Sequence, residues 1–424
     1  MSRDIKKIGI IGGGAAGLFA ACLIKKFSGD RLCEVTLLEK NEIPGKKLIL
    51  TGHGRCNITN RKPASELKAG YHEADNFIYP AIKEFGPEDT ISFIENDIGL
   101  KTKEEDNNRI FPVCDSAARV RDELVSYISD HTKIICNAKV LDIRKDSSFE
   151  VSTADEKYSF DYVILSSGGS SFPQTGSTGD SYRLAEKMSH TVITPRAALA
   201  PVKADEDSLG FIKNLSGVSV TSKASLFCNG KKTASTEGEI LFTEFGLTGP
   251  AVMEISREIP RDISDCNPYF ELDLVPSLND EQFDQEFQKL IGDHPDTKIT
   301  SLLARYVPAS VAGEIASKAG VSDLYAQGFT KDNRRKIVNE MKHLKVGIGR
   351  EPSIDKAYVT RGGVSLKEVD RKTMQSRLVP GLYILGEALD IDGISGGYNL
   401  QACMSEAYLA VKDILICTGN PIFS

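Results

Sequence analysis

The sequence has no long apolar run, and this absence limits where the protein can act. No stretch approaches the ~18 continuous apolar residues that a membrane-spanning helix needs, so we expect no membrane partner. The chain enters its first predicted strand almost at once, which leaves no room for a signal peptide. The six histidines are dispersed and form no His-x-x-x-His pair, so we expect no metal site.

Cysteine is present but follows no pattern. The nine cysteines contain no Cys-x-x-Cys pair and no regular spacing, which is typical of reduced thiols in a cytoplasmic protein. The Cys-x-x-x-x-Cys pair of a disulfide reductase is also missing, because Arg61 stands five positions after Cys56. Without a resolving partner, Cys56 is not predicted to act as a redox thiol.

The charge balance is acidic, with a formal net charge of −7 over 424 residues. Nucleic-acid surfaces are usually basic, so we expect no nucleic-acid partner. The basic run 334–336 is short and is interpreted as a solvated helix face. The length allows two or three domains, and the oligomeric state stays open.

The first motif is a glycine turn, GIIGGGAAG, between an apolar run and a helix of small residues. Gly12 allows a tight turn, Gly14 lets a pyrophosphate approach the backbone, and Gly17 lets helix and strand pack closely. The free amides at the helix start would face the phosphates. A second strand ends in Glu39, 22 residues after Gly17, where an acid can accept both hydroxyls of an adenosine ribose. This pattern predicts dinucleotide binding, which NAD and FAD enzymes share.

The next segment, residues 41–60, is rich in glycine and polar residues and has little periodicity. An irregular segment of this length in a compact domain is usually functional, and this one follows directly from the ribose acid. Its glycines permit close backbone approach, its basic groups can serve a pyrophosphate or a substrate anion, and its amide and hydroxyl groups can bond a ring edge. The residues concerned are Lys46, Lys47, Gly54, Arg55, Asn57 and Thr59.

A further part of the predicted site follows a strand over residues 161–166. Residues 133–160 read as a three-stranded meander whose first strand covers 133–144, and the apolar strand then ends at Ser167, Gly168 and Gly169. A three-stranded crossover before a glycine-ended strand is typical of flavin-binding domains. On the meander, Val140 can offer a backbone amide to adenine or can be a plain core residue.

The composition changes at about residue 192. Residues 192–275 are β-rich, with an Asn-Gly hairpin signal at 229–230, and suggest a small barrel or a sandwich. Within them, the glycine-rich run FTEFGLTGP, which contains Glu244, could reach back over the cofactor. Residues 276–345 then read as helical, with apolar stripes that are typical of core packing.

The α/β pattern returns in the last segment of the chain. A strand ends at Gly386 and Glu387, and Gly397 precedes a last helix that begins with Asn399 and Leu400. NAD enzymes need only one mononucleotide pair, whereas FAD enzymes of this architecture close their site with such a late segment. Its carboxylate can hold the ribityl chain, and the helix amides can face the flavin N1–C2=O edge, where the dipole stabilises negative charge by about 1 kcal/mol. The sequence therefore predicts FAD.

Several motifs carry a family resemblance: PGKKLILTGHGRCNITN, FTEFGLTGPAVM, the stretch from AYVTRGG to GEALDIDG, and GGYNLQ. Through them the whole chain resembles the bacterial NAD(P)/FAD-dependent oxidoreductases, the family that includes aminoacetone oxidase and the BaiN-like bile-acid dehydro-reductases. The resemblance implies an α/β fold with a discontinuous Rossmann-like FAD domain of the two-dinucleotide-binding type, an inserted β-barrel and a small helical domain.

The resemblance also implies domain boundaries and cofactor contacts. The FAD domain would cover residues 1–191 and 357–424, the β-barrel 192–276 and 345–356, and the helical insert 277–344. FAD, bound non-covalently, would be held by Gly12, Gly14, Ala15, Ala16, Gly17, Glu39, Lys40, Asn57, Gly386, Glu387, Asp390, Asn399 and Leu400.

The sequence departs from the family pattern in three places. Glu244 stands where relatives usually have His, and Ser181 stands in GDSY where GDGY is usual. The final helix reads MSEAYLA where a small SSGxxAG is common. An acid at position 244 could change the substrate or the pH optimum, so the chemistry transfers less well than the fold.

We therefore expect an FAD-dependent oxidoreductase that passes hydride from NAD(P)H through flavin N5 to an electron-poor C=C or C=N bond of a small molecule. Glu244, Tyr398 and His53 are candidate proton donors. No second GxGxxG follows a strand, so the nicotinamide would dock transiently. This leaves open a flavin oxidase of a small amine that uses O2, and a non-catalytic FAD-binding module.

Overall fold

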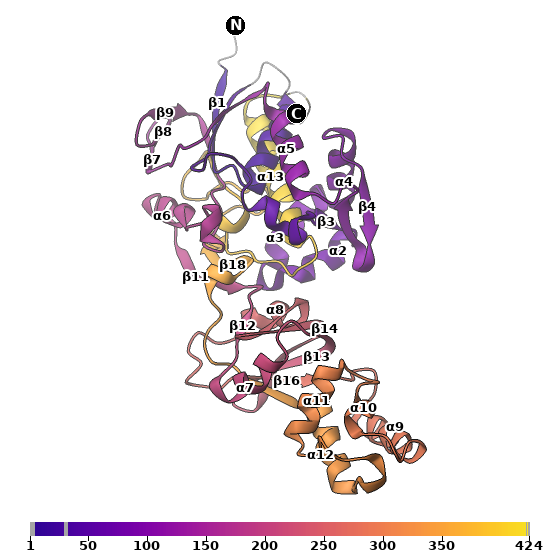
Figure 1. Cartoon of the computed structure of the whole chain (residues 1–424). Coiled ribbons are helices and arrows are strands. Elements are labelled where there is room, and N and C mark those ends of the chain that lie inside the picture. Colours follow the sequence, from indigo (N-terminus) through magenta and orange to yellow (C-terminus); the bar gives the residue numbers. More distant parts are fainter. Residues whose placement is uncertain (1–4, 29–32, 421, 423–424) are drawn as a thin grey trace. The chain divides into compact units, whose positions relative to one another are not determined.

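The computed structural model describes residues 5–28, 33–420 and 422, and it divides into two compact units. Unit 1 comprises residues 1–196 and 359–424, and unit 2 comprises residues 197–358 (Figure 1). The chain thus leaves unit 1 once and returns to it. The further division of the inserted segment into a β-barrel and a helical domain stays a prediction.

Unit 1 is built on a five-stranded sheet in the order β19-β10-β1-β2-β6. All of its pairings are parallel. Most positions in these strands are buried, as is usual for parallel strands that helices cover on both faces. The strands are β1 (Lys6–Ile11), β2 (Cys33–Leu38), β6 (Thr132–Ile135), β10 (Tyr162–Leu165) and β19 (Leu382–Ile384).

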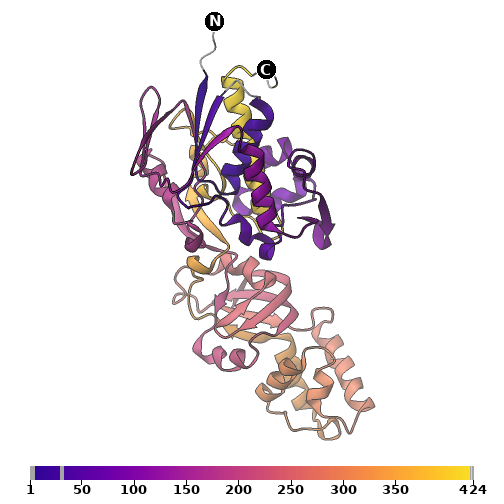
Figure 2. The same cartoon turned by 45° about the horizontal axis from the view of Figure 1, so that its top comes forward.

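The first and last helices of the chain pack together. α1 (Ala15–Ser28) contacts both α13 (Tyr398–Cys417) and α5 (Ala117–Ile128). In Figures 1 and 2, α13, in yellow, lies among the indigo and violet segments from the start of the chain. Both helices contribute to one large hydrophobic core, in which each fully buried leucine or isoleucine contributes about 1.5–3 kcal/mol. This packing joins the glycine turn to the C-terminal segment.

Smaller elements surround this sheet. A three-stranded antiparallel sheet has the order β3-β5-β4, and β11 pairs with β18. These elements are α2 (Ala64–Leu67), α3 (Asp75–Glu84), α4 (Pro87–Asn96), α6 (Asp180–Lys187), β3 (Thr59–Asn60), β4 (Thr102–Glu105), β5 (Arg109–Pro112), β11 (Val192–Ala198) and β18 (Val359–Val364).

The predicted meander is confirmed only in part. β7 (Asp142–Lys145), β8 (Phe149–Ser152) and β9 (Lys157–Phe160) form an antiparallel sheet. The expected single strand over 133–144 is wrong, because its first half belongs to β6 and pairs with β2 in the parallel sheet. Val140 therefore lies in the irregular segment between β6 and β7. From the sequence alone, two successive short apolar runs are easily interpreted as one strand, because the pattern does not show which strand each run pairs with.

Unit 2 contains a six-stranded antiparallel sheet in the order β12-β15-β14-β13-β16-β17. A bridge between Ala204 and Ile348 joins the two edges, so the sheet curves back on itself. The Asn229-Gly230 hairpin connects β13 to β14 as predicted. The strands are β12 (Val202–Lys203), β13 (Ser219–Cys228), β14 (Lys231–Thr243), β15 (Gly246–Thr248), β16 (Tyr269–Asp273) and β17 (Leu344–Gly347).

The helices of unit 2 share one hydrophobic core with this sheet. Phe270 and Leu272 of β16 belong to the same buried cluster as Phe283, Phe287 and Ile337 of the helices. The apolar stripes predicted to be core are therefore confirmed. The helices are α7 (Glu206–Asn214), α8 (Pro250–Ile255), α9 (Asp280–Asp293), α10 (Ile299–Leu303), α11 (Ala309–Lys318) and α12 (Lys331–Lys342).

Two cysteines that are far apart in the sequence meet in unit 2. Cys228 and Cys266 have their Sγ atoms 3.2 Å apart, and the Asn229 amide donates to the Cys266 carbonyl at 2.9 Å. We expect a mild thiol oxidant such as diamide to join them, with both thiol hydrogens passing to the oxidant. Closing a loop of 38 positions should stabilise the protein by about 3 to 4 kcal/mol.

Mass spectrometry after oxidation checks this expectation, because the intact mass should fall by two hydrogens and a peptide map should contain the cross-link. The Cys228→Ser variant is the control and should show neither change. A disulfide that joins the exposed Cys114 or Cys417 instead would contradict it.

Among the described residues, no helix combines the length and the apolar composition needed to cross a membrane. The same residues contain no group of three or more His, Cys, Asp or Glu side chains that could hold a metal ion.

Candidate cofactor and active site

One edge of the parallel sheet collects the glycine motifs. The last residues of β1, β2, β10 and β19 lie in register across the sheet. The segments that follow them therefore start side by side: the glycine turn, Glu39, the run 166–169 and Gly386. Ligands of open parallel sheets bind outside the carboxyl ends of the strands, so this edge is the candidate site.

The glycine turn is tight in two places and open in a third. Gly12 has φ +103°, and its amide donates to the Leu38 carbonyl at 2.9 Å. A Cβ atom on Gly17 would lie 2.0 Å from the Gly12 carbonyl oxygen, so turn and helix touch. A Cβ atom on Gly14 would meet only the Ser166 carbonyl oxygen, at 3.9 Å. The backbone at Gly14 is therefore open to the approach of a ligand.

The amides next to this open space have no partner in the structure. Those of Gly14, Ala15 and Ala16 make no hydrogen bond within the described part of the chain. They are the first amides of α1, where the helix dipole is positive. Free amides at a helix start bind phosphate groups, so this part of the site suits the pyrophosphate of a dinucleotide.

Glu39 is held firmly beside the turn. Its carboxylate is 6% exposed; Oε2 accepts from the Gly13 amide at 2.8 Å, and Oε1 accepts from the Asn41 backbone and side chain at 2.8 and 2.7 Å. Each carboxylate oxygen has more than one lone pair, so these bonds leave capacity for hydroxyl donors. The sequence singled out Glu39 but missed Asn41, which orients it.

Lys40 follows Glu39 in the chain, and Val140 lies two positions after Ala138, whose amide donates to the Glu39 carbonyl at 2.8 Å. The Lys40 ammonium donates to Thr178 Oγ1 at 2.7 Å and to Asp180 Oδ2 at 2.5 Å. Burial acts to raise the pKa of Asp180, but the Lys40 hydrogen bond, the positive charges of Lys40 and Lys139 and the Thr178 hydrogen bond together keep this pKa below its usual value. The Val140 carbonyl accepts from Arg183 at 3.0 Å, whereas its amide has no partner in the residues that the structure describes. That amide is free to bond an adenine edge.

Lys47 and Glu387 meet across the sheet edge. The Lys47 ammonium donates to both Glu387 oxygens, at 2.7 and 2.9 Å, and to Ser171 Oγ at 2.6 Å. Glu387 Oε2 also accepts from Ser171 Oγ at 3.1 Å and from the Thr360 amide at 3.3 Å. Sequence reasoning missed Ser171 and Thr360, because their common contact with Glu387 is formed only by the fold; Thr360 stands in the AYVTRGG motif, which served only for the family resemblance. Lys46, by contrast, only pairs with the exposed Glu42, at 3.3 Å.

The run after β10 closes the space behind the turn. Side chains pack closely against Gly168 and Gly169: a Cβ atom on Gly169 would lie 2.4 Å from Thr360 Oγ1, and one on Gly168 would lie 3.3 Å from Ser177 Oγ. Ser167 Oγ is buried and has no hydrogen-bond partner among the described residues. An unsatisfied buried hydroxyl at this edge is consistent with a ligand that supplies the missing partner.

The Arg55 side chain is paired with two acids, and His53 is exposed. The Arg55 guanidinium lies 4.3 Å from the centre of the Phe111 ring and is paired with Glu105 and Asp115. These hydrogen bonds raise the pKa of Arg55. They also pair the guanidinium, which was expected to bind a pyrophosphate or a substrate anion, with acids of the protein itself. His53 and Gly54 are exposed at the end of the short helical segment Leu48–Gly54.

Asn57 and Thr59 fasten the loop to the start of α13. With its nitrogen toward the carbonyls of Thr59 and Ile110, the Asn57 side chain accepts from the Gly397 amide at 3.1 Å. Thr59 Oγ1 donates to Gln401 Oε1 at 2.5 Å. A Cβ atom on Gly397 would lie 2.5 Å from the Thr59 carbonyl, which explains glycine at this position.

The start of α13 offers a second group of free amides. The amides of Tyr398, Asn399 and Leu400 have no hydrogen-bond partner within the described ranges, and the first intrahelical bond runs from Gln401 to the Gly397 carbonyl at 3.0 Å. The Asn399 side chain is engaged with the backbone of Gly393, at 2.9 Å in both directions. These amides can stabilise negative charge on a bound group.

Two of the three candidate proton donors, Tyr398 and His53, lie in unit 1, and the third, Glu244, lies in unit 2. The Tyr398 ring is 3% exposed and packs against Tyr71, with ring centres 5.7 Å apart, inside the core of unit 1. His53 is exposed in unit 1, and Glu244 is exposed in unit 2 between β14 and β15. Their catalytic roles stay predictions. Asp390 accepts from the Gly362 amide at 2.9 Å, and burial raises its pKa.

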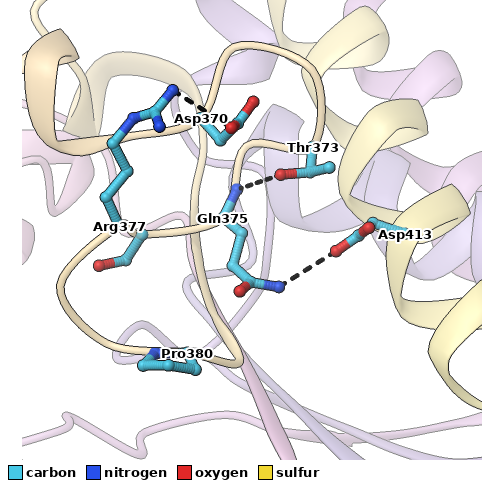
Figure 3. Close-up of a pocket in the computed structure, with 7 residues that line it drawn as sticks. Asp370, Thr373, Gln375, Arg377, Pro380 and Asp413 are labelled. Carbon is cyan, nitrogen blue, oxygen red and sulfur yellow. Dashed lines mark hydrogen bonds and ion pairs between the residues drawn. The ribbon is translucent and has the colours of Figure 1, made fainter.

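A pocket in unit 1 lies away from this edge (Figure 3). Its walls come from the segment 370–380, which precedes β19, and from Asp413 near the end of α13. Gln375 Nε2 bonds Asp413 at 3.1 Å, and Arg377 pairs with Asp370 at 3.2 Å, so its charges are largely compensated. Asp413 follows the start of α13 at Tyr398 by 15 positions, which is about 22 Å along the helix, so the pocket is distant from the helix start at the candidate site.

A parallel sheet with a glycine turn, a buried acid after β2 and a closing C-terminal helix defines a Rossmann-like, FAD-binding protein. Comparison with known proteins agrees. The model of the HI0933-like protein Rossmann domain family matches residues 6–413, and the chain belongs to this family.

Curated relatives match over nearly their whole length. A 3-dehydro-bile acid delta(4,6)-reductase of Clostridium scindens is 30% identical, over 96% of this chain and 98% of the relative. The ribosomal RNA dihydrouridine synthases of Escherichia coli and Haemophilus influenzae are 29% and 30% identical over 97% and 96% of this chain, and over 98% and 97% of their own lengths.

A solved structure has the same fold. The 3-ketosteroid delta1-dehydrogenase from Sterolibacterium denitrificans aligns with a TM-score of 0.55 at 12% identity, over 98% of this chain and all of that one. The predicted fold class and family are therefore confirmed. The chain is an FAD-dependent oxidoreductase.

Proposed function

We propose that this oxidoreductase reduces a C=C bond conjugated to a carbonyl group in a small molecule, with NAD(P)H as the transient reductant. When bound, FAD supplies hydride transfer through its N5 atom. One observation carries the proposal: the first amides of α1 and the first amides of α13 are free of hydrogen bonds within the described residues, and both helices belong to unit 1.

The two helix starts have different roles in this proposal. The α1 amides, the open space over Gly14 and the carboxylate of Glu39 would hold the pyrophosphate and the ribose. Glu387, fixed by Lys47, would bond the ribityl chain. The amides of Asn399 and Leu400 would face the flavin N1–C2=O edge and stabilise its negative charge after reduction by about 1 kcal/mol.

The choice of acceptor rests on what the relatives are named for. A delta(4,6)-reductase of a 3-dehydro-bile acid saturates a double bond near a ring ketone, and a dihydrouridine synthase saturates a double bond of uracil next to a carbonyl. Both acceptors are electron-poor alkenes. Because all nine cysteines are free thiols, we also propose a cytoplasmic setting for the reaction.

Ribosomal RNA is a second candidate acceptor, because two full-length relatives are named for that substrate. The acidic net charge of −7 led us to expect no nucleic-acid partner, but net charge alone does not exclude a local RNA site.

The test is an anaerobic titration of the flavin-loaded protein with NADPH and with NADH. We expect the visible flavin absorbance to bleach with one of them, and a 3-oxo-4,6-diene bile acid to restore it. Reoxidation by a uridine-containing ribosomal RNA fragment alone would favour the second candidate. Bleaching by a small amine, with peroxide formed in air and no response to either nicotinamide, would replace the proposal with the oxidase alternative.

A further inference from the structure

One buried acid is not explained by the cofactor contacts described above. Glu406 lies on α13 and has 0% exposure, the least of any carboxylate in the buried part of the protein. Its Oε2 accepts from the Gly386 amide at 2.5 Å. Its Oε1 is buried and has no hydrogen-bond partner within the described residues. A buried carboxyl group with a single bond is costly unless it serves a purpose.

The partner of Glu406 is the turn that precedes Glu387. Gly386 has φ +64°, and a Cβ atom there would lie 3.2 Å from Ala16 Cβ and 3.4 Å from Cys403 Sγ. The turn is thus enclosed between the start of α1 and the second turn of α13. Glu406 and Cys403 are three residues apart and share one face of α13. The hydrogen bond that the Gly386 amide donates to Glu406 is therefore the polar contact that holds this amide in the enclosed space.

Among the residues that the structure describes, no cation compensates Glu406. The titratable groups that face it are Cys403 on its own helix and Tyr71 on the segment packed against that helix; their pKa values are raised mainly by burial and secondarily by Glu406. Glu387 and Lys47 act on Cys403 from the site side, but Lys47 is bonded to Glu387. Burial raises the pKa of Glu406 to about 8, against the smaller opposing effect of the Gly386 amide.

We infer that Glu406 is the positioning residue of the cofactor site, and that it holds the Gly386–Glu387 turn as a neutral acid whose ionisation weakens FAD binding. The inference rests on the proposed assignment of Gly386 and Glu387 to the cofactor. An ionised Glu406 would be a buried charge with one hydrogen bond, and its free oxygen would require water. Water can reach it only if α13 or the Gly386 turn moves, and both would line the bound FAD.

The experiment measures FAD affinity of the flavin-free protein from pH 6 to pH 9.5, by quenching of flavin fluorescence. The wild-type affinity should fall by about tenfold per pH unit above the pKa of Glu406. Glu406→Gln keeps an acceptor for the Gly386 amide and cannot ionise, so its affinity should stay constant over this range. Glu406→Ala removes the acceptor and should weaken binding at every pH.

Glu84→Gln is the matched control. Glu84 is an exposed acid at the end of α3, and it pairs at 2.8 Å with Lys412 of α13, the helix that carries Glu406. Its pH profile should follow that of the wild type. In the infrared spectrum at pH 7, the wild type should have the carbonyl band of a protonated carboxylic acid, and Glu406→Gln should lack it.

An alkaline loss of affinity that persists in Glu406→Gln would overturn the inference, and so would the absence of the protonated-acid band from the wild type. Failure of the proposed function looks different, because the wild type would then bind no FAD even at pH 6. In that case the unfolding of the flavin-free protein still tests Glu406. The stability of the wild type relative to Glu406→Gln should be greatest at acid pH and should fall as the pH rises from the ordinary pKa of Glu to about 8, because only the wild type carries this raised pKa.

Discussion

Alanine at Gly17 is expected to lower the free energy of unfolding by about 3 kcal/mol, although alanine ordinarily stabilises a helix by about 1 kcal/mol relative to glycine. The new Cβ atom would lie 2.0 Å from the Gly12 carbonyl oxygen and 2.8 Å from Ser166 Oγ. The carbonyl belongs to the backbone of the turn, so it cannot move without displacing β1 or α1. The steric cost therefore exceeds the gain in helix propensity. Urea unfolding of the flavin-free protein measures the difference.

Alanine at Gly14 is the matched control for this experiment. A Cβ atom at Gly14 has its nearest neighbour 3.9 Å away, so the stability of the flavin-free protein should change by less than about 0.5 kcal/mol. FAD affinity should nevertheless fall by about tenfold or more, because the methyl group would fill the space that a pyrophosphate needs. If Gly14→Ala bound FAD as tightly as the wild type, the pyrophosphate would not lie over Gly14. A fully stable Gly17→Ala would contradict the steric argument.

Removal of Lys47 is expected to cost about 2 kcal/mol of stability, because it leaves Glu387 without its counter-charge. The two side chains are only 24% and 18% exposed, so water cannot fully replace the lost partner. Lys47→Met, Glu387→Gln and the double variant form a double-mutant cycle. The cycle should give a coupling energy above about 1 kcal/mol, because each single change removes the same interaction.

The neighbouring pair of Lys46 and Glu42 provides the comparison. Glu42 is 72% exposed, so Lys46→Met should cost less than about 0.5 kcal/mol. Equal costs for the two lysine variants, or a coupling energy near zero between Lys47 and Glu387, would show that the pair does not brace the site. FAD titration of the same variants then measures how far Glu387 acts on the cofactor.

Much of the fold could be predicted because its signals are local. The glycine turn, the acid after β2 and the helix after Gly397 each depend on a few adjacent residues, and the structure places these motifs in one unit. The strand at 133–144 could not be predicted correctly. Its first half is an apolar run whose partner is β2, about 100 positions earlier, and periodicity does not identify partners.

The sequence by itself determined the class of protein, because the signals for this class are local. They are a glycine at a tight turn, an apolar run that must be buried, and an acid at a set distance from the turn. Only the tertiary structure decided which charges are free. Arg55 was a plausible anion ligand until Glu105 and Asp115 were found to occupy it, and Lys47 pairs with Glu387 from 340 positions away. Glu406 stands in the MSEAYLA segment, which the sequence marked only as a departure from the family pattern. Its environment is set by Gly386 and Tyr71, which the chain brings to α13 only on folding, so its chemistry could not be read from its neighbours in sequence.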